Sequence, residues 1–293
     1  MCKTALIMPP DRPMKWISKY NSLTVSQVGK EMPNGGMNEA GLVVEQTTLW
    51  QSSYPNKEGL PAIGELQWIQ LMLDTCASIE EVKETAESLQ IVNPFSRLHY
   101  IICDRTGECA VFEFLNGELA IYSGSTLPVP VIVNTPYLET MVRLKSPGNT
   151  CPDGLNDYDL DSIKRFDRAV ECLEYAATEV VDLNEMLRST QRVDTAFSIV
   201  YNTATLEIQF ESKRFPKQKR IRFQDIDFVS DSGIAVNIQQ DKEVNFDLYS
   251  ADLNQRIVEA FFRNPQLSTV FGSPLSDEVL TVIARFPESF RLR

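Results

Sequence analysis

Three short β-strand patterns joined by tight turns, over residues 98–122, constrain the fold of this chain more than any other feature. Residues 98–103, 109–115 and 118–122 are rich in β-branched and aromatic side chains. The last two segments are joined by Asn116 and Gly117, a dipeptide that is the strongest short-range signal for a β-hairpin. Because strands joined by such short turns run in opposite directions, this β-meander predicts an antiparallel sheet.

A glycine-rich stretch at residues 32–44, MPNGGMNEAGLVV, predicts a second hairpin upstream of the meander. The alternating residues 22–28 are expected to form one strand and residues 41–50 the next. We expect Gly35 and Gly36 to make the turn between them, since glycine adopts positive φ without a steric penalty.

The remaining pattern places helices between groups of strands. Helices are expected at residues 60–74, at residues 79–89 behind a capping box formed by Ser78 and Glu81, at residues 161–175, and after Asp182. Further strands are expected at residues 129–134, 196–202, 206–210 and 221–229. Because the strands come in hairpins and do not alternate with helices, the pattern favours an α+β fold with antiparallel sheets.

Length and charge limit the classes of function. The 293 residues suit one main domain, which we expect at residues 1–243, with a C-terminal extension at 244–293 packed on it. A net charge of −12 argues against nucleic acid or anionic membrane as a partner, because phosphate groups require a basic surface. No apolar run approaches the ~18 residues that span a membrane. The first residues do not resemble a secretory signal, so we expect a cytoplasmic protein.

The cysteines and the single histidine narrow the chemistry. The six cysteines form no C-x-x-C pair, so neither a structural zinc site nor another cofactor is expected. Cys103 and Cys109 flank a turn and can face each other, but in a cytoplasmic protein we expect both to be reduced thiols. His99 lies in a strand pattern and is expected to be a hydrogen-bonded structural residue. With one histidine, multi-histidine metal sites are excluded.

Five motifs in chain order resemble those of the choloylglycine hydrolase family, which includes the penicillin V acylases. They are WISKYNS at 16–22, GMNEAGL at 36–42, LHY followed by DRTG at 98–107, VNTP at 133–136 and KRFDR at 164–168. The resemblance implies the αββα sandwich of the N-terminal nucleophile hydrolases. It also implies cleavage of linear, non-peptide amide C–N bonds in small amphipathic N-acyl substrates such as conjugated bile salts or penicillin V, in a protein that can be a homo-oligomer.

The resemblance also assigns roles to three residues. Family members attack the amide with a cysteine that becomes the first residue of the mature chain, and here Cys2 follows Met1. The α-amino group, with an ordinary pKa of about 7.7–8.0, acts as the base. Asn134 would donate to the oxyanion and Arg165 would lie near the thiol. Taken without the family, Asn134 is equally a turn residue and Arg165 a solvated helix residue.

One family motif is not found. An R-x-x-D-W segment should follow the cysteine strand, but Lys15 stands where its aspartate is needed. Either Cys2 is the nucleophile and a hairpin has been deleted, or the chain begins at an internal methionine and the true nucleophile strand lies upstream. We favour the second explanation and expect a fold that is incomplete at the N-terminus. The alternative function is a catalytically impaired relative that binds a ligand or assembles with itself. We expect Asn134 and Arg165 to meet in an apolar cleft, with Cys2 lying apart.

Overall fold

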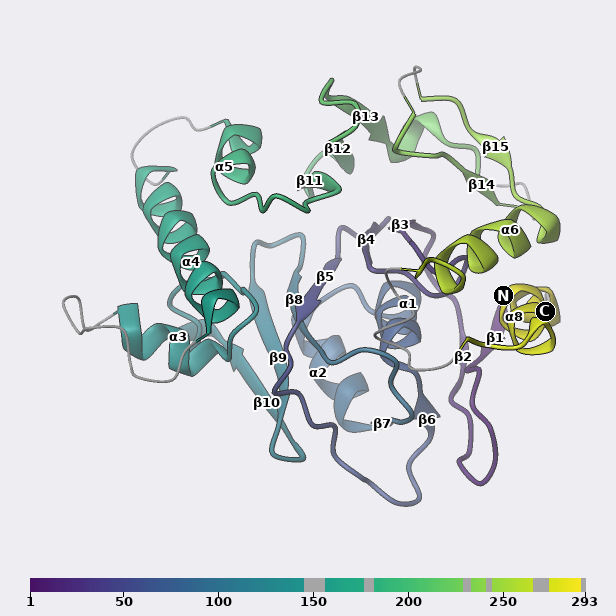
Figure 1. The fold of residues 1–293 in the computed structure, drawn as a ribbon. Coiled ribbons are helices and arrows are strands. Elements are labelled where there is room, and N and C mark those ends of the chain that lie inside the picture. The colour runs from purple at the N-terminus through teal and green to yellow at the C-terminus, as the bar shows by residue number, and fades with distance from the viewer. Residues whose placement is uncertain (145–155, 177–181, 229–232, 241–243, 266–273, 291–293) are drawn as a thin grey trace.

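The structure is a computed structural model that describes residues 1–144, 156–176, 182–228, 233–240, 244–265 and 274–290. It shows the predicted α+β architecture, in which antiparallel sheets pack between helices (Figure 1). Across these residues, none of the helices combines the length and the apolar character that a membrane crossing requires.

A six-stranded sheet organises the molecule. From edge to edge its strands are β10 (Glu118–Ser123), β9 (Cys109–Leu115), β8 (Leu98–Cys103), β5 (Val43–Thr48), β4 (Gly35–Asn38) and β3 (Ser22–Val25). Every neighbouring pair is antiparallel. The meander predicted around Asn116 and Gly117 is therefore confirmed, and both residues adopt the positive φ that their turn requires.

Two helices cover one face of this sheet. These are α1 (Glu65–Thr75) and α2 (Ile79–Glu87). The short strands β6 (Ala62–Ile63), before α1, and β7 (Gln90–Ile91), after α2, pair with each other in parallel. Trp68 of α1 lies against the rings of Tyr100 and Phe112 in the main core cluster. The predicted cap is present, since the Ser78 side chain accepts from the backbone N–H of Glu81.

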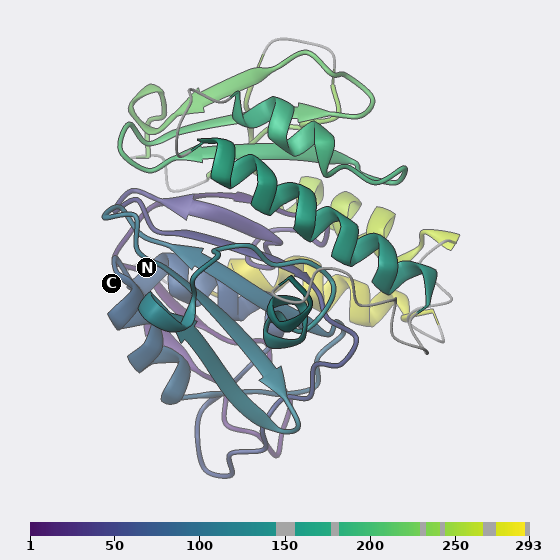
Figure 2. The ribbon, with the colours of Figure 1, turned by 90° about the vertical axis from the view of Figure 1, so that its left-hand side faces the viewer.

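The opposite face of the six-stranded sheet is shared by a second sheet and two helices. The second sheet contains β11 (Phe197–Asn202), β12 (Glu207–Ser212) and β13 (Lys219–Arg222), and its Ile208 packs against Met37 and Val43. Helices α3 (Tyr137–Leu144) and α4 (Asp157–Ala176) cover β8 and β9, and α5 (Leu183–Ser189) contacts β11. Figure 2 shows the second sheet stacked over the first. The two packed antiparallel sheets confirm the predicted sandwich.

The first and last segments of the chain lie at one end of the molecule. Strands β1 (Cys2–Thr4) and β2 (Lys15–Ile17) form a separate antiparallel pair. Helices α6 (Ala251–Phe262) and α8 (Asp277–Arg285) form an apolar cluster with Val28. Strand β14 (Ile234–Ala235) pairs with β15 (Asp247–Leu248) in antiparallel fashion. Short 3-10 helices occur at Gly124–Thr126, Phe223–Asp225 and Phe286–Ser289.

The glycine-rich stretch folds differently from the prediction. Gly35 and Gly36 lie inside β4, and the positive φ falls instead on Gly41, at the turn into β5. Close packing explains both glycines in the strand. A Cβ atom at Gly35 would lie 2.3 Å from the Glu45 carboxylate, and one at Gly36 would lie 2.5 Å from the Leu23 carbonyl oxygen. These positions need glycine for space and not for a turn.

The strand predicted at residues 129–134 is absent. This segment is irregular and pairs with no strand in the described part of the chain. Pro128 and Pro130 explain the failure, since neither has an N–H to donate to a ladder. The segment instead crosses the sheet face and ends in a corner at residues 133–137, just before α3.

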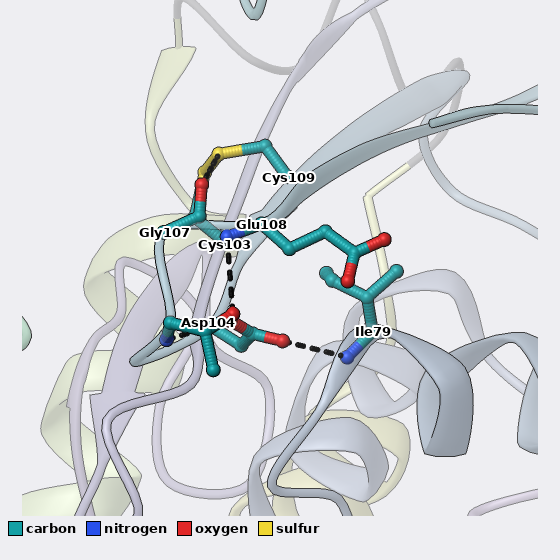
Figure 3. The surroundings of a disulfide bond; sticks show 7 residues. Ile79, Cys103, Asp104, Gly107, Glu108 and Cys109 are labelled. Atoms are coloured by element: carbon teal, nitrogen blue, oxygen red, sulfur yellow. Dashed lines mark hydrogen bonds between the residues drawn. A yellow bond between two sulfur atoms is a disulfide. The ribbon is translucent and has the colours of Figure 1, made fainter. Parts of the chain in front are cut away.

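The expectation of reduced thiols at Cys103 and Cys109 is also wrong. The two cysteines are opposite each other across the β8–β9 hairpin and form a disulfide (Figure 3). Within the turn that it closes, the Asp104 carboxylate accepts from the backbone N–H of Ile79 at the start of α2, at 3.2 Å. The Arg105 guanidinium donates to the Ala204 carbonyl at 3.0 Å, which ties the hairpin to the second sheet.

Candidate active site

The corner at residues 133–137 places Asn134 between the sheet and α4. Asn134 is 7% exposed, and its side-chain amide donates to the Thr47 hydroxyl at 2.7 Å and to the Thr48 carbonyl at 2.8 Å. Its backbone N–H donates to the hydroxyl of Ser162, which is fully buried in α4. Asn134 is thus held from both sides, by the end of β5 and by the helix.

One face of α4 supplies the other half of the site. Tyr158, Asp161, Ser162 and Arg165 are spaced so that they lie along a single side of the helix. The Arg165 guanidinium donates through Nε to Asp161 at 3.0 Å and through Nη2 to the side-chain amide oxygen Oδ1 of Asn134 at 2.8 Å. A guanidinium carries five N–H donors, so three of those of Arg165 have no hydrogen-bond partner among the described residues.

The predicted meeting of Asn134 and Arg165 is therefore confirmed, although 31 positions separate them in the chain. The Arg165 side chain is 12% exposed, so most of it lies inside the protein. Asn134 already uses both amide hydrogens, whereas the Thr47 hydroxyl accepts from it and keeps its own hydrogen available. The groups free to donate to an incoming oxygen are those of Arg165 and Thr47.

A second arginine borders this cluster. Arg192, beyond α5, donates to Asp161 at 2.7 Å and lies over the Tyr158 ring, 5.1 Å from its centre. Burial raises the pKa of Tyr158, although the charges of Arg192 and Arg165 oppose the change. Trp50, two residues beyond Thr48 in the chain, is 53% exposed. The Tyr158 ring and a second cation, Arg192, thus border the Asn134–Arg165 contact.

His99 is completely buried and bonds through both ring nitrogens, as expected of a structural histidine. Its Nε2 lies 2.7 Å from the Val133 carbonyl oxygen, and its Nδ1 lies 2.7 Å from the Glu113 carboxylate. Because a carbonyl oxygen only accepts, Nε2 must carry the hydrogen. The histidine therefore holds the residue next to Asn134.

Cys2 lies far from the Asn134–Arg165 contact. It is an exposed residue of β1, opposite Ile17 of β2. Figure 1 shows the N-terminus beside α8 at one side of the molecule and α4 at the other. The neighbouring Lys3 anchors this strand through buried ion pairs with Glu31 and Asp74, each at 2.8 Å. The structure thus brings together two of the three predicted site residues and leaves the third apart.

No other described cysteine takes the place of Cys2. Among the described residues the free cysteines besides Cys2 are Cys76, which is buried in the main core, and Cys172, whose Sγ lies 3.8 Å from the Ser189 hydroxyl. Cys151 lies outside the described residues. Within the same part of the chain, no three His, Cys, Asp or Glu side chains gather in a way that could hold a metal ion.

A cavity of about 420 Å³ lies between α5 and the second sheet. Asp182, Asn184, Tyr201, Asn202 and Gln209 contribute to its largely polar lining. Neither Asn134 nor Arg165 lines it, so this cavity is not the apolar cleft that we predicted around that pair.

Comparison with known proteins decides which family these residues resemble. A sequence profile of the linear amide C–N hydrolases, choloylglycine hydrolase family, matches residues 19–146. The resemblance to the choloylglycine hydrolases is confirmed. A penicillin V acylase of Pectobacterium atrosepticum is 23% identical to this chain over 220 residues, which are 65% of this chain and 56% of that protein. The chain thus matches little more than half the length of this relative.

Solved structures related to the family share the fold. The penicillin V acylase from Agrobacterium tumefaciens has a TM-score of 0.61 and 24% identity, over 77% of this chain and 76% of that one. A variant of the conjugated bile acid hydrolase from Clostridium perfringens also has a TM-score of 0.61, with 18% identity over 85% of this chain and 88% of that one. These likenesses show that the choloylglycine hydrolase fold is present.

The sequence did not identify all of the groups at the site. Asp161 and Ser162 precede Arg165 by one turn of α4, a spacing that could have drawn attention to both. Thr47 gave no comparable signal, because its role depends on which strand end lies beside the corner. Arg192 reaches the site across 31 positions from Asp161, and no local pattern indicates that contact.

Proposed function

We propose that this chain carries the carbonyl-binding part of a linear amide hydrolase site, formed by Asn134, Arg165 and Thr47. The observation that carries the proposal is the 2.8 Å contact between Arg165 and Asn134. Each of these residues lies in a different motif that resembles the family. The proposed substrate class is a small amphipathic N-acyl amide, of which penicillin V and a glycine-conjugated bile salt are the two probes.

The proposed chemistry is attack of a thiolate on the amide carbonyl carbon. The carbonyl oxygen then gains negative charge, and the donors of Arg165 and Thr47 face the place where it would form. Asn134 would join them by exchanging its bond to Thr47 for one to the oxyanion. A single preorganised donor of this kind contributes roughly 3 kcal/mol to the stabilisation of a transition state. When the C–N bond breaks, the amine leaves with the proton that the α-amino base took from the thiol, and a thioester remains on the cysteine. Water then hydrolyses the thioester, which releases the acid and restores the thiol.

Cys2 is the proposed nucleophile in the sequence, but reaching Asn134 would require β1 to leave its position. That movement would separate Lys3 from Glu31 and Asp74, and breaking buried ion pairs of this kind costs several kcal/mol. We therefore expect this polypeptide to bind N-acyl amides but to hydrolyse them slowly. Binding without turnover would correspond to the alternative of a catalytically impaired relative.

Titration of the full chain with penicillin V tests the proposal, with the fluorescence of Trp50 as the signal. Trp16 and Trp68 are buried, so the exposed Trp50 should dominate the change, and W50F should abolish it. N134D and R165Q should each weaken binding at least tenfold. The matched control is R263Q, since Arg263 pairs with Asp277 on the surface, away from the corner.

Equal affinity of N134D, R165Q and the unchanged chain would refute the carbonyl-binding role. Turnover is measured separately, as release of the free amine. A rate comparable to that of the penicillin V acylase from Agrobacterium tumefaciens would contradict the expectation that Cys2 is held away from the site.

A further inference from the structure

A row of polar side chains crosses three strands beneath the corner at residues 133–137. Thr47 of β5 lies opposite His99 of β8, and His99 contacts Glu113 of β9 through a 2.7 Å bond. All three side chains point to the face of the sheet that α3 and α4 cover. His99 and Glu113 are completely buried, so this row lies inside the protein.

Each member of the row holds a different part of the corner. Thr47 accepts from the side chain of Asn134 at 2.7 Å, and His99 donates to the carbonyl oxygen of Val133 at 2.7 Å. Glu113 accepts from the backbone N–H of Tyr137 at 2.9 Å. The backbone is therefore fixed one residue before Asn134 and three residues after it.

This arrangement is expensive in free energy for a purely structural contact. Burial of a carboxylate beside an imidazole requires removal of both from water, and apolar residues of similar volume often stabilise a core equally well. In addition, the second carboxylate oxygen of Glu113, Oε2, is buried with no hydrogen-bond partner in the described part of the protein. An incompletely satisfied polar group of this kind calls for an explanation beyond packing.

We propose that His99 and Glu113 are positioning residues that set the orientation of Asn134 for its ligand. They act through the Val133 carbonyl and the Tyr137 amide and do not touch the substrate. The inference rests on the proposed function of the corner, and it adds two residues from strands β8 and β9 to that function. An amide donor displaced by about 1 Å loses much of its effect on a bound oxygen, so the backbone on both sides must be fixed.

The test measures penicillin V affinity in a double-mutant cycle that joins H99N to N134A. H99N shortens the side chain so that it no longer reaches the Val133 carbonyl. We expect H99N and E113L each to weaken binding at least fivefold. In the N134A background the same substitutions should have less than a twofold effect, because no correctly placed amide remains to be disturbed. A merely structural role would give equal effects in both backgrounds.

The matched control is S52A. Ser52 is also buried and donates to the Leu98 carbonyl at 2.7 Å, immediately before His99, but it does not contact the corner. S52A should leave the affinity unchanged. If H99N does not fold, H99F serves in its place, since its ring fills the buried site but has no donor for the Val133 carbonyl.

Two outcomes separate this inference from the proposed function. If N134A does not weaken binding, the proposed function of the corner fails. If N134A weakens binding but H99N and E113L do not, the positioning role is overturned and the proposed function stands. The same conclusion follows if the effects of H99N and E113L add to that of N134A. In the absence of any ligand, the side-chain amide resonances of Asn134 provide the readout. They should shift in H99F and E113L and stay fixed in S52A, and unmoved resonances in all three variants would overturn the inference.

Discussion

Two buried polar networks, one at β1 and one at the corner beside α4, differ in how completely their hydrogen bonds are satisfied. Strand β1 and helix α4 lie at opposite sides of the molecule (Figure 1). In the Lys3 network, the ammonium group contacts both Glu31 and Asp74. Both oxygens of Asp74 accept further bonds, from Trp16 and Ser18. The Lys3 ammonium group and both oxygens of Asp74 are paired there, and these contacts fix β1 and β2 to the end of α1.

The Asn134 corner, by contrast, contains hydrogen-bonding groups that no described residue pairs with. Within the described residues, Glu113 Oε2 has no partner and three donors of Arg165 have none recorded. A closed network stabilises the fold, whereas unused donors beside a partly exposed surface can accept a ligand. We infer from this difference that the charged cluster beside Cys2 is structural, and we propose the Asn134 corner as the cluster that binds a ligand.

The largest expected effect comes from breaking the closed network with K3M. Burial would lower the pKa of Lys3, but the charges of Glu31 and Asp74 outweigh it and raise that pKa above its ordinary value of 10.5. The stabilisation is thus fully present below pH 10.5 and is lost as the pH rises through the higher value of the folded state. At pH 7 we expect K3M to lower the free energy of unfolding by about 3–5 kcal/mol in urea denaturation.

K83M is the control for this comparison. Lys83 forms a partly exposed pair with Glu80 on α2, and such pairs contribute less than about 1 kcal/mol. Similar losses for K3M and K83M would show that the Lys3 network does not anchor the N-terminal strand.

Glu45 offers a further case, because this acid bonds to a neutral hydroxyl group and not to a charged partner. It lies on β5 two residues before Thr47 and bonds to the hydroxyl of Tyr201 in the second sheet. Burial raises its pKa to about 7. A carboxyl whose pKa is raised in the folded state destabilises the fold when ionised, so this penalty grows from about pH 4.5 to 7 and persists above.

Removing that charge with E45Q should therefore stabilise the protein at pH 8 by about 2 kcal/mol relative to the unchanged chain, and have little effect at pH 4.5. Urea denaturation at both pH values measures the difference. The exposed Glu58 supplies the control, since E58Q should give the same stability change at either pH. A loss of stability at pH 8 in E45Q would contradict the assignment.

The disulfide offers a smaller test of what holds the corner. Cys103 and Cys109 close the far end of the hairpin whose strands also carry His99 and Glu113. Dithiothreitol should lower the free energy of unfolding by about 2 kcal/mol, as expected for a loop this short, and leave the affinity for penicillin V within twofold. The same treatment should not affect C103S/C109S. Equal stability with and without reductant in the unchanged chain would show that the thiols are reduced, as the sequence suggested.

Local signals predicted much of this fold. Asn116 and Gly117 fixed the meander, and Ser78 fixed the start of α2, because each residue acts on its own neighbours. The prediction failed where packing decided the outcome. Gly35 is needed to make room for Glu45, a residue from the next strand, and the prolines before residue 131 removed a strand that hydrophobicity alone suggested.

The candidate site likewise combines residues that local motifs predicted with residues whose positions depend on packing. Motifs indicated Asn134 and Arg165, and the fold brought them into contact. The row formed by Thr47, His99 and Glu113 could not be predicted, because it depends on the register of three strands. The sequence of a single strand does not determine that register. The position of Cys2 depends likewise on ion pairs made by its neighbour with distant residues.

Hydrogen–deuterium exchange of the full chain, with and without saturating penicillin V, tests most directly whether the ligand binds at the corner and not at the N-terminal strand. The account predicts that the ligand slows exchange in peptides covering residues 45–50 and 131–141. Peptides covering residues 2–5, which include Cys2, should exchange equally in both samples. Protection of residues 2–5 with no change at residues 131–141 would contradict the account.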